Sequence, residues 1–341
     1  MNSHAPVALI GAGMAGLSCA TALRQAGRQV QLFDKSRGPA GRMSTRRGDG
    51  WACDHGAQYF TARDERFREE VARWLAAGVA APWAPRLEVL GGLGPHHPDP
   101  AVSRWVGLPR ATAPARWLAA QLPVSLASTV TALRRGPGGR WQLQTAEHGW
   151  MDQSFSAVLL ALPAPQAAVL LEPHSTALLE WCARARMRGC WALMLQYPTP
   201  PALPFDAAFV NAGPLRWIAR NSSKPGRTGA ETWLLHAEAE WSEAHLEHPP
   251  EQVAASLLQA FAEHGGPAPQ RWTAHRWRYA DCAPALETGF AWQEDAGLGL
   301  CGDWLHGGKV EGAWLSGLKL AQALLLGREA SGSSSRGHGG A

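Results

Sequence analysis

Three glycines near the start of the chain, Gly11, Gly13 and Gly16, have the spacing of a phosphate-binding turn. The first glycine permits a tight turn, the second lets a pyrophosphate approach the backbone, and the third lets a helix pack closely on a strand. Asp34 follows Gly13 by 34 − 13 = 21 positions, close to the roughly 20 expected for a carboxylate that bonds a ribose hydroxyl. These residues predict a dinucleotide site.

The flanking segments supply the elements that such a site requires. Apolar residues predict a strand over 7–10, a helix over 14–25 with Gly27 as its C-cap, and a second strand over 29–33. The N-terminus of that helix directs free N–H groups and a partial positive charge at the phosphates.

A glycine-rich basic segment comes next, with Gly38, Gly41 and Arg42. It resembles the GG-R motif of FAD enzymes related to amine oxidases, in a degenerate form because Pro39 and Ala40 separate the two glycines. The Arg42 guanidinium is suited to neutralise pyrophosphate charge. The alternative interpretation is a solvated basic loop.

A third motif lies near the other end of the chain. We expect a buried strand over 298–301, then Gly302 and Asp303, and a helix that opens near Val310. Asp303 would accept hydrogen bonds from ribityl hydroxyls, and the helix N-terminus would face the flavin pyrimidine edge. The alternative interpretation is a C-terminal helix that only packs on the domain. It would explain the apolar residues of this segment but not its GDWLHGGKVEGA motif.

Together these motifs resemble the renalase family, flavoproteins on the amine-oxidase-like FAD fold. The resemblance covers most of the chain, and its narrower motifs are DHGAQYF (54–60), NSSKPGR (221–227) and HRWRYA (275–280). In that family the glycine-rich loop, the GG-R arginine and the GAQY pair contact FAD, which implies Ala15, Arg42, Gln58 and Tyr59 here. We expect non-covalent FAD, since no cysteine falls in an attachment motif. The full set of expected cofactor-binding positions is Gly11, Ala12, Gly13, Met14, Ala15, Gly16, Asp34, Lys35, Gly41, Arg42, Met43, Gln58, Tyr59, Gly302, Asp303, Val310, Glu311 and Gly312.

The composition is that of an ordinary globular protein. Of 341 residues 46% are hydrophobic and 18% are charged, and the net charge of +4 gives no basic stripe for nucleic acid. The six cysteines show no metal-binding or C-x-x-C spacing, which favours reduced thiols in the cytoplasm and predicts no metal site. His96 and His97 are interpreted as part of a solvated loop. No apolar run approaches the ~18 residues of a membrane span, and no signal peptide is expected before the first strand.

The positions of the motifs predict a fold of the α/β class, α+β overall. A discontinuous Rossmann-like FAD-binding domain would comprise 1–74, 123–165 and 281–326. Within it we expect a meander with alternating Trp141, Leu143 and Thr145, followed by a strand over 157–162. A mixed-sheet substrate domain would comprise 75–122 and 166–280. Residues 327–341 are of low complexity and are predicted to be a disordered tail.

The resemblance implies oxidation of 2- or 6-dihydronicotinamide isomers of NAD(P) to NAD(P)+, with O2 reduced to H2O2. No acid/base motif is evident, and the loss of hydride from a dihydropyridine needs none. Two alternatives stay open: an amine oxidase or desaturase on the same fold, and a flavin-binding module without turnover. The isomer, the choice between NAD and NADP, and the oligomeric state stay open as well.

An amide and a histidine could hold the nicotinamide carboxamide, and a tryptophan could stack on the ring. The candidate catalytic residues on this basis are His275, Trp277, His236, Asn221 and Trp292. His236 could equally be a core histidine. Lys224 and Arg227 are expected either to meet substrate phosphates or to lie in a solvated turn.

Overall fold

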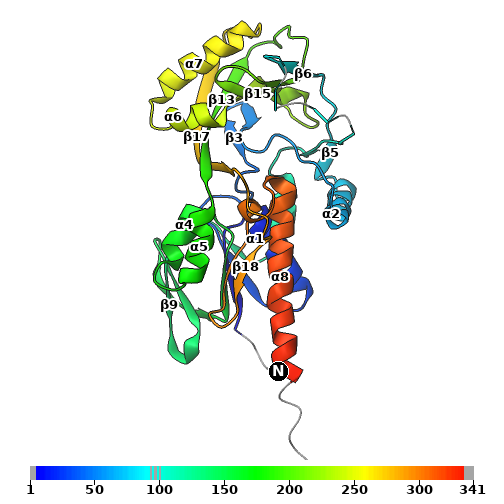
Figure 1. The fold of residues 1–341 in the computed structure, drawn as a ribbon. Coiled ribbons are helices and arrows are strands. Elements are labelled where there is room, and N and C mark those ends of the chain that lie inside the picture. Colours follow the sequence, from blue (N-terminus) through cyan, green and yellow to red (C-terminus); the bar gives the residue numbers. More distant parts are fainter. Residues whose placement is uncertain (1–4, 93, 96–97, 100, 334–341) are drawn as a thin grey trace, which may run out of the picture. The chain divides into compact units, whose positions relative to one another are not determined.

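The computed structural model describes residues 5–92, 94–95, 98–99 and 101–333. The chain forms two compact units, each assembled from separate stretches of sequence (Figure 1). Unit 1 comprises 1–41, 115–187 and 282–341, and unit 2 comprises 42–114 and 188–281. No helix of the described residues is both long and apolar enough to cross a bilayer.

Unit 1 is built on a six-stranded sheet. Its central strand β1 (Val7–Ile10) is buried along its whole length and runs parallel to β2 (Val30–Phe33) on one side and β12 (Ala157–Leu160) on the other. The order is β18–β19–β12–β1–β2–β8, completed by β18 (Ala291–Gln293), β19 (Leu298–Leu300) and β8 (Val124–Ser125). Because these strands are parallel except at β18, their carboxyl ends meet at one edge, where α/β folds bind ligands.

Two helices of unit 1 pack side by side: α1 (Met14–Gln25) and α8 (Lys309–Ser333) (Figure 1). Glycine permits the close approach, since a Cβ at Gly317 would lie 2.0 Å from the carbonyl oxygen of Ala15. The Ser18 hydroxyl also donates a hydrogen bond of 2.7 Å to the carbonyl of Trp314.

The rest of unit 1 is an antiparallel meander with two covering helices. Trp141, Leu143 and Thr145 of its middle strand are buried in alternation, which confirms the predicted pattern. Trp141 and Leu143 belong to one apolar core together with Leu170 and Leu178, which come from the two helices. The elements are β9 (Val130–Arg135), β10 (Trp141–Thr145), β11 (Gly149–Phe155), α4 (Ala164–Leu171), α5 (Thr176–Arg184) and α3 (Ala113–Ala119), with short 3-10 turns η1 (Pro137–Gly139) and η3 (Asp303–Leu305).

Unit 2 contains a second six-stranded sheet, which is mixed. The order is β17–β13–β16–β15–β14–β6, in which β6 is parallel to β14 and the pairs β13/β16, β16/β15 and β15/β14 are antiparallel. The strands are β17 (Arg271–Cys282), β13 (Met187–Tyr197), β16 (Glu231–Ala237), β15 (Leu215–Arg220), β14 (Ala207–Val210) and β6 (Leu87–Leu90). Its other elements are β3 (Thr45–Gly48), β4 (Trp51–Asp54), α2 (Glu65–Ala76), β5 (Ala80–Pro82), β7 (Trp105–Gly107), η2 (Asn221–Ser223), α6 (Ala239–Ala244) and α7 (Pro250–Glu263).

The mixed α/β fold is confirmed, but the compact units divide the chain at other positions than the predicted domains. Residues 42–74 group with unit 2, because Cys53 of β4 is buried against Ala192, Met194 and Leu234. Residues 166–187 group with unit 1 through the core that α4 and α5 share with the meander.

The predicted tail is wrong in part, since α8 continues to Ser333. Residues 334–341, and His96 and His97 of the predicted loop, lie outside the described residues.

Candidate cofactor and active site

In unit 1, the expected dinucleotide residues gather at the carboxyl edge of the parallel sheet. Gly11 has a φ of +108°, and a Cβ there would lie 2.4 Å from the carbonyl oxygen of Ala161. A Cβ at Gly16 would lie 2.0 Å from the carbonyl oxygen of Gly11. These two glycines are therefore required by the fold itself.

Gly13 differs, because a Cβ there would meet no protein atom within 4 Å. It is also the N-cap of α1 and provides no side-chain cap, so the first-turn N–H groups stay available to an anion. An open approach over uncapped donors is the cradle that a pyrophosphate requires, and the residues present therefore fit a bound flavin dinucleotide.

Asp34 closes this cradle from the end of β2. One carboxylate oxygen accepts a hydrogen bond of 2.7 Å from the backbone N–H of Ala12, and the other accepts 2.8 Å from that of Ser36. A carboxylate has about four acceptor positions, so Asp34 can still bond a ribose while it fixes the loop. Lys35 follows it directly.

The glycine-rich segment after β2 lies on the first loop. The Ala40 N–H donates 3.0 Å to the carbonyl of Ala12, and a Cβ at Gly41 would lie 3.3 Å from the Cα of Gly13. Ala40 has a φ of +118°, a conformation that glycine adopts more readily. At this position of the degenerate motif, an alanine therefore has the backbone conformation that is typical of glycine.

The C-terminal motif reaches the same edge from β19. The Gly302 N–H donates 2.9 Å to the Ser316 hydroxyl of α8, which joins the turn to the helix. Asp303 is 7% exposed and begins η3. Helix α8 begins one residue before the predicted Val310, with Glu311 in its first turn, and a Cβ at Gly312 would lie 2.0 Å from the carbonyl oxygen of His306. Trp292 lies on the edge strand β18, where Cε3 of its ring would be 3.1 Å from a Cβ at Gly299.

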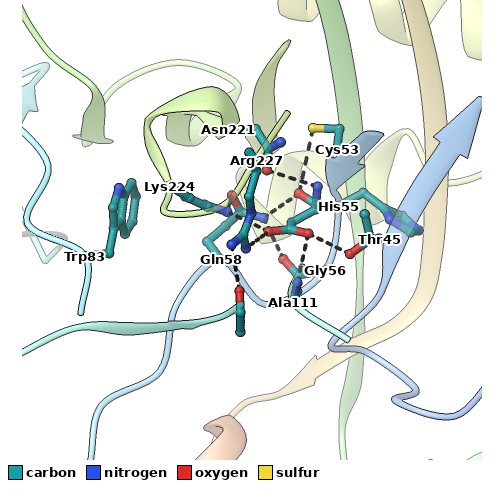
Figure 2. A network of polar contacts seen from close by, with 12 residues as sticks. Thr45, Cys53, His55, Gly56, Gln58, Trp83, Ala111, Asn221, Lys224 and Arg227 are labelled. Carbon is teal, nitrogen blue, oxygen red and sulfur yellow. Dashed lines mark hydrogen bonds and ion pairs between the residues drawn. The ribbon is translucent and has the colours of Figure 1, made fainter. Parts of the chain in front are cut away.

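The other candidate residues belong to unit 2, and many of them surround one buried carboxylate, Asp54 (Figure 2). Asp54 is 1% exposed. One of its oxygens accepts 2.6 Å from the Thr45 hydroxyl and 3.2 Å from the Ala111 N–H. The other oxygen pairs with Arg227 and, at 3.4 Å, with Lys224.

These charges set the ionisation of the group. Burial alone would raise the pKa of Asp54, but the charges of Lys224 and Arg227, with hydrogen bonds from Arg227 and Thr45, lower it to about 2. Burial lowers the pKa of the Lys224 amine, which Asp54 opposes. Two cationic side chains thus share one carboxylate inside the protein.

Gln58 connects this network to the backbone. Its side-chain oxygen accepts 3.0 Å from the Lys224 amine, and its amide donates to the carbonyls of Asp54 (2.8 Å) and Gly56 (3.0 Å). Both amide hydrogens of Gln58 are therefore used within unit 2. Asn221 is used in the same way: its oxygen accepts 3.1 Å from the Asp54 N–H, and its amide donates to Ala52 and Thr232.

A second group in unit 2 consists of aromatic and imidazole rings. His55 stacks on Trp277, with ring centres 5.1 Å apart, and meets the edge of His275 at 4.7 Å. The carbonyl of His55 contacts both Trp277 Nε1 (2.9 Å) and His236 Nε2 (3.1 Å). The structure thus brings together three of the five candidate catalytic residues, His236, His275 and Trp277.

The imidazoles in this group are neutral at pH 7. Burial, with the charges of His275 and Arg46, lowers the pKa of His55 to about 3. Burial lowers the pKa of His236 to about 4, and burial and Arg46 lower that of His275. A neutral imidazole with so low a pKa is a weak general base.

Tyr59 belongs to a third group, of large rings. Its ring centre lies 5.6 Å from that of Trp217 and 6.2 Å from that of Trp83. The Arg104 guanidinium lies 5.4 Å from the Tyr59 ring centre. Arg42 and Met43 begin unit 2; Arg42 donates 3.1 Å to the carbonyl of Ala280, and Met43 is 5% exposed.

Several of these residues were not singled out from the sequence. Asp54 and His55 lie inside the DHGAQYF motif, and that membership was the only available signal. Lys224 is 2% exposed and therefore does not lie in a solvated turn, which was one of the two expectations for it. The described part of the chain holds no group of three His, Cys, Asp or Glu side chains that could bind a metal ion.

Comparison with known proteins agrees with this geometry. Residues 9–74 match the NAD(P)-binding Rossmann-like domain, and residues 107–325, more than half of the chain, match the flavin containing amine oxidoreductase family. The fold is similar to that of a protein from Exiguobacterium sp. 255-15 with the provisional name protoporphyrinogen oxidase (TM-score 0.73, 13% identity, 96% of this chain and 100% of the other).

It is also similar to putrescine oxidase (TM-score 0.71, 14% identity, 95% and 99% covered) and to cyclohexylamine oxidase from Brevibacterium oxydans IH-35A (TM-score 0.70, 14% identity, 96% and 100% covered). At these identities the similarity establishes the fold. The match over residues 107–325 establishes the family: this chain belongs to the flavin containing amine oxidoreductases.

Proposed function

We propose that the chain is an FAD-dependent oxidase of renalase type that oxidises 2- or 6-dihydronicotinamide isomers of NAD(P), with FAD held non-covalently. In the balanced reaction one dihydronicotinamide, one O2 and one proton give one nicotinamide cation and one H2O2. A bound flavin would supply the hydride acceptor and pass the two electrons to O2. The residues of this chain bind and orient the two partners.

The observation that carries this proposal is the meeting of three motifs inside unit 2. Asp54 of DHGAQYF pairs with Lys224 and Arg227 of NSSKPGR, and Trp277 of HRWRYA donates to the carbonyl of His55. These are the narrower motifs of the renalase resemblance. Their mutual contacts support the idea that they act as one structural and functional group.

The charge of this group favours an anionic substrate. Two basic side chains, Lys224 and Arg227, surround the single carboxylate of Asp54 (Figure 2). A third basic side chain, Arg104, lies over the ring of Tyr59. A pyridine dinucleotide carries phosphate charge that such a surrounding attracts, whereas a protonated amine would be repelled.

The imidazoles favour the same reaction. Because the pKa values of His55, His236 and His275 are lowered, these rings are poor bases at neutral pH. Loss of hydride from a dihydropyridine requires no base, while oxidation of an amine requires the amine to lose its proton first.

An amine oxidase is the second candidate. The family and the putrescine and cyclohexylamine oxidases on the same fold favour it, and the Tyr59–Trp217 pair offers aromatic faces of the kind that hold amines.

Oxygen uptake with product identification tests the proposal. Purified yellow enzyme should consume O2 with 2- or 6-dihydro-NAD(P), and should form NAD(P)+ and H2O2 in equal amounts. Uptake with amines and none with any dihydronicotinamide isomer would favour the second candidate.

A further inference from the structure

One ring nitrogen of His236 is held by the backbone of another residue. Its Nε2 atom lies 3.1 Å from the carbonyl oxygen of His55. Because a carbonyl oxygen only accepts hydrogen bonds, Nε2 carries the proton and donates. The indole Nε1 of Trp277 donates to the same oxygen, at 2.9 Å. This carbonyl therefore fixes the tautomer of the imidazole and orients both rings.

The other ring nitrogen, Nδ1, is left as an acceptor. Burial lowers the pKa of His236 to about 4, with a further contribution from the charges of Arg216 and Lys224, so the imidazole is neutral at pH 7. A neutral imidazole with its proton on Nε2 has a lone pair on Nδ1. Within the described chain, the contact with His55 is the one hydrogen bond of this ring. The lone pair of Nδ1 is therefore available to a donor on a ligand.

Nδ1 of His236 also keeps accessible surface. Among the described residues, Nδ1 of His55 is buried without a partner, but Nδ1 of His236 is not covered to that degree, and 9% of the residue stays exposed. The neighbouring rings of His275 and Trp277 are only half-buried. Since only one N–H group has to reach one nitrogen, this exposure is sufficient for a hydrogen bond.

The register of the sheet of unit 2 places two side chains beside His236. In β16, His236 is paired with Ala192 of β13 and with Trp217 of β15, and paired residues project from the same face of a sheet. Ala192 contributes only a methyl group on one side, and Trp217 contributes an indole on the other. These surroundings of the acceptor nitrogen suit a flat ring that carries one N–H donor.

We infer that Nδ1 of His236 accepts a hydrogen bond from the carboxamide of the substrate and so selects an amide over the corresponding carboxylic acid. This inference rests on the proposed function and deepens it, because it narrows the substrates to dihydro forms of nicotinamide nucleotides and excludes those of nicotinic acid. The carboxamide NH2 group donates to Nδ1, whereas a carboxylate has no hydrogen to donate. With the acid, the lone pair of Nδ1 would face a negatively charged oxygen and lose its partner.

The positive charges nearest to the ring do not offset this loss. Arg216 is paired with Asp281 at 3.4 Å, and Lys224 is paired with Asp54 at 3.4 Å. Each of these cations already has a carboxylate partner, so neither is free to turn toward a second one. Protonation of the imidazole would offset the loss, but the low pKa of His236 opposes it at neutral pH.

Calorimetric binding to the FAD-loaded full chain tests this selection. The probes are NAD+, which is a product of the proposed reaction, and its nicotinic acid analogue, deamido-NAD+. The two probes differ only in the amide and the acid group. At neutral pH we expect NAD+ to bind at least about tenfold more tightly than deamido-NAD+.

Two variants and a matched control locate the contact. His236→Leu removes the acceptor and should bring the affinities for NAD+ and deamido-NAD+ to within about threefold of each other. His236→Gln keeps one donor for the carbonyl of His55 and one acceptor for the amide, so it should retain most of the wild-type ratio. His148→Leu, at an exposed position, should leave the ratio unchanged.

NMR of protein with isotope-labelled histidine gives a second readout, which does not depend on the folding of His236→Leu. On addition of NAD+ to the wild type, the Nδ1 resonance of His236 should move toward the position of a hydrogen-bonded nitrogen, and deamido-NAD+ should leave it in place. The His236→Gln variant assigns this resonance, because the variant lacks it. The same response to both ligands would overturn the inference.

Equal affinities of the wild type for NAD+ and deamido-NAD+ would also overturn it, as would a preference that survives in His236→Leu. If the dihydro isomers of deamido-NAD were oxidised as efficiently as those of NAD, the proposed function would stand and the role of His236 would not. If NAD+ were preferred but no dihydronicotinamide reduced the flavin, the carboxamide contact would stand and the proposed function would not.

Discussion

The Nζ atom of Lys224 lies 3.4 Å from the Oδ2 atom of Asp54, although 170 positions separate the two residues in the chain. Both side chains are almost completely buried, at 0% and 1% exposure. Arg227 binds the same oxygen. This ion network joins the end of β4 to the loop after η2 and so fixes the segment that contains Gln58 and Tyr59.

Removal of the carboxylate should be the most damaging change to this network. Asp54→Asn leaves Lys224 and Arg227 as two buried cations without a counter-charge, and breaking a buried pair in this way costs about 3–5 kcal/mol. Denaturant unfolding of the flavin-free protein measures the loss. Asp99→Asn, at an exposed carboxylate (51%), serves as the control, with a loss of about 0–1 kcal/mol. A similarly small loss for Asp54→Asn would contradict the account.

Lys224→Met should be tolerated better than Asp54→Asn. It leaves Asp54 paired with Arg227, so one negative and one positive charge remain in the buried site. The lysine stem is replaced by a side chain of similar volume. The same unfolding experiment gives the order of the two variants. A larger loss of stability in Lys224→Met than in Asp54→Asn would mean that Lys224 contributes more to the stability of the network than Asp54 does.

Acid should destabilise the protein through its buried imidazoles. The pKa of His236 is about 4 in the folded chain against an ordinary 6.5, so the unfolded chain binds more protons. This contribution is fully present above pH 6.5 and is lost as the pH falls toward 4. At ~1.4 kcal/mol for each pKa unit, His236 alone accounts for on the order of 3 kcal/mol.

His236→Gln should therefore flatten the fall in unfolding free energy between pH 6.5 and 4. His148→Gln, at an exposed position, should leave the wild-type slope. The same slope in His236→Gln and wild type would show that this imidazole is not held neutral.

Ala40→Gly should stabilise the protein. Ala40 is 2% exposed and has a φ of +118°, and a strained backbone of this kind costs about 1–3 kcal/mol. The greater freedom of glycine in the unfolded chain offsets part of the gain, so an increase of about 1 kcal/mol is expected. The control is Ala72→Gly, at an exposed position in the middle of α2. It should lower the free energy of unfolding by about 1 kcal/mol. A lower free energy of unfolding in both variants would show that the backbone at Ala40 is not strained.

Gly13 and Gly16 should separate cofactor binding from folding. A Cβ at Gly13 meets no protein atom, so Gly13→Ala should keep the stability of the flavin-free chain and weaken FAD binding. A Cβ at Gly16 would lie 2.0 Å from a backbone oxygen, so Gly16→Ala should destabilise the flavin-free chain. Flavin titration and unfolding give the two readouts. Unweakened FAD binding in Gly13→Ala would place the pyrophosphate elsewhere.

Local sequence signals were sufficient for the first strands and helix of unit 1. The helix after the glycine turn runs from Met14 to Gln25 as predicted, and β2 begins at Val30, one residue later than expected. The C-cap is Ala26, with Gly27 in the left-handed conformation directly after it. These features depend on glycine, apolar periodicity and capping within a few residues, which a sequence displays directly.

Unit 2 depends on contacts between distant residues, which local patterns do not display. The sequence SSKPGR reads as a polar turn, yet Lys224 is buried because Asp54 and Gln58 supply its partners from another part of the chain. The amide of Asn221, a candidate substrate group, bonds residues of β4 and β16, and these contacts could not be predicted from the local sequence. The compact units differ from the predicted domains for the same reason, since β4 packs on β16.

The most direct test of the central claim is anaerobic stopped-flow reduction of the bound flavin. Saturating 2-, 4- and 6-dihydronicotinamide dinucleotides are compared with putrescine and cyclohexylamine in one buffer. We expect fast bleaching with the 2- or 6-isomer, with a rate constant that changes little between pH 6 and 8, and no bleaching with the amines. Bleaching by an amine, with a rate that rises with pH as the amine loses its proton, and none by any dihydronicotinamide isomer would contradict it.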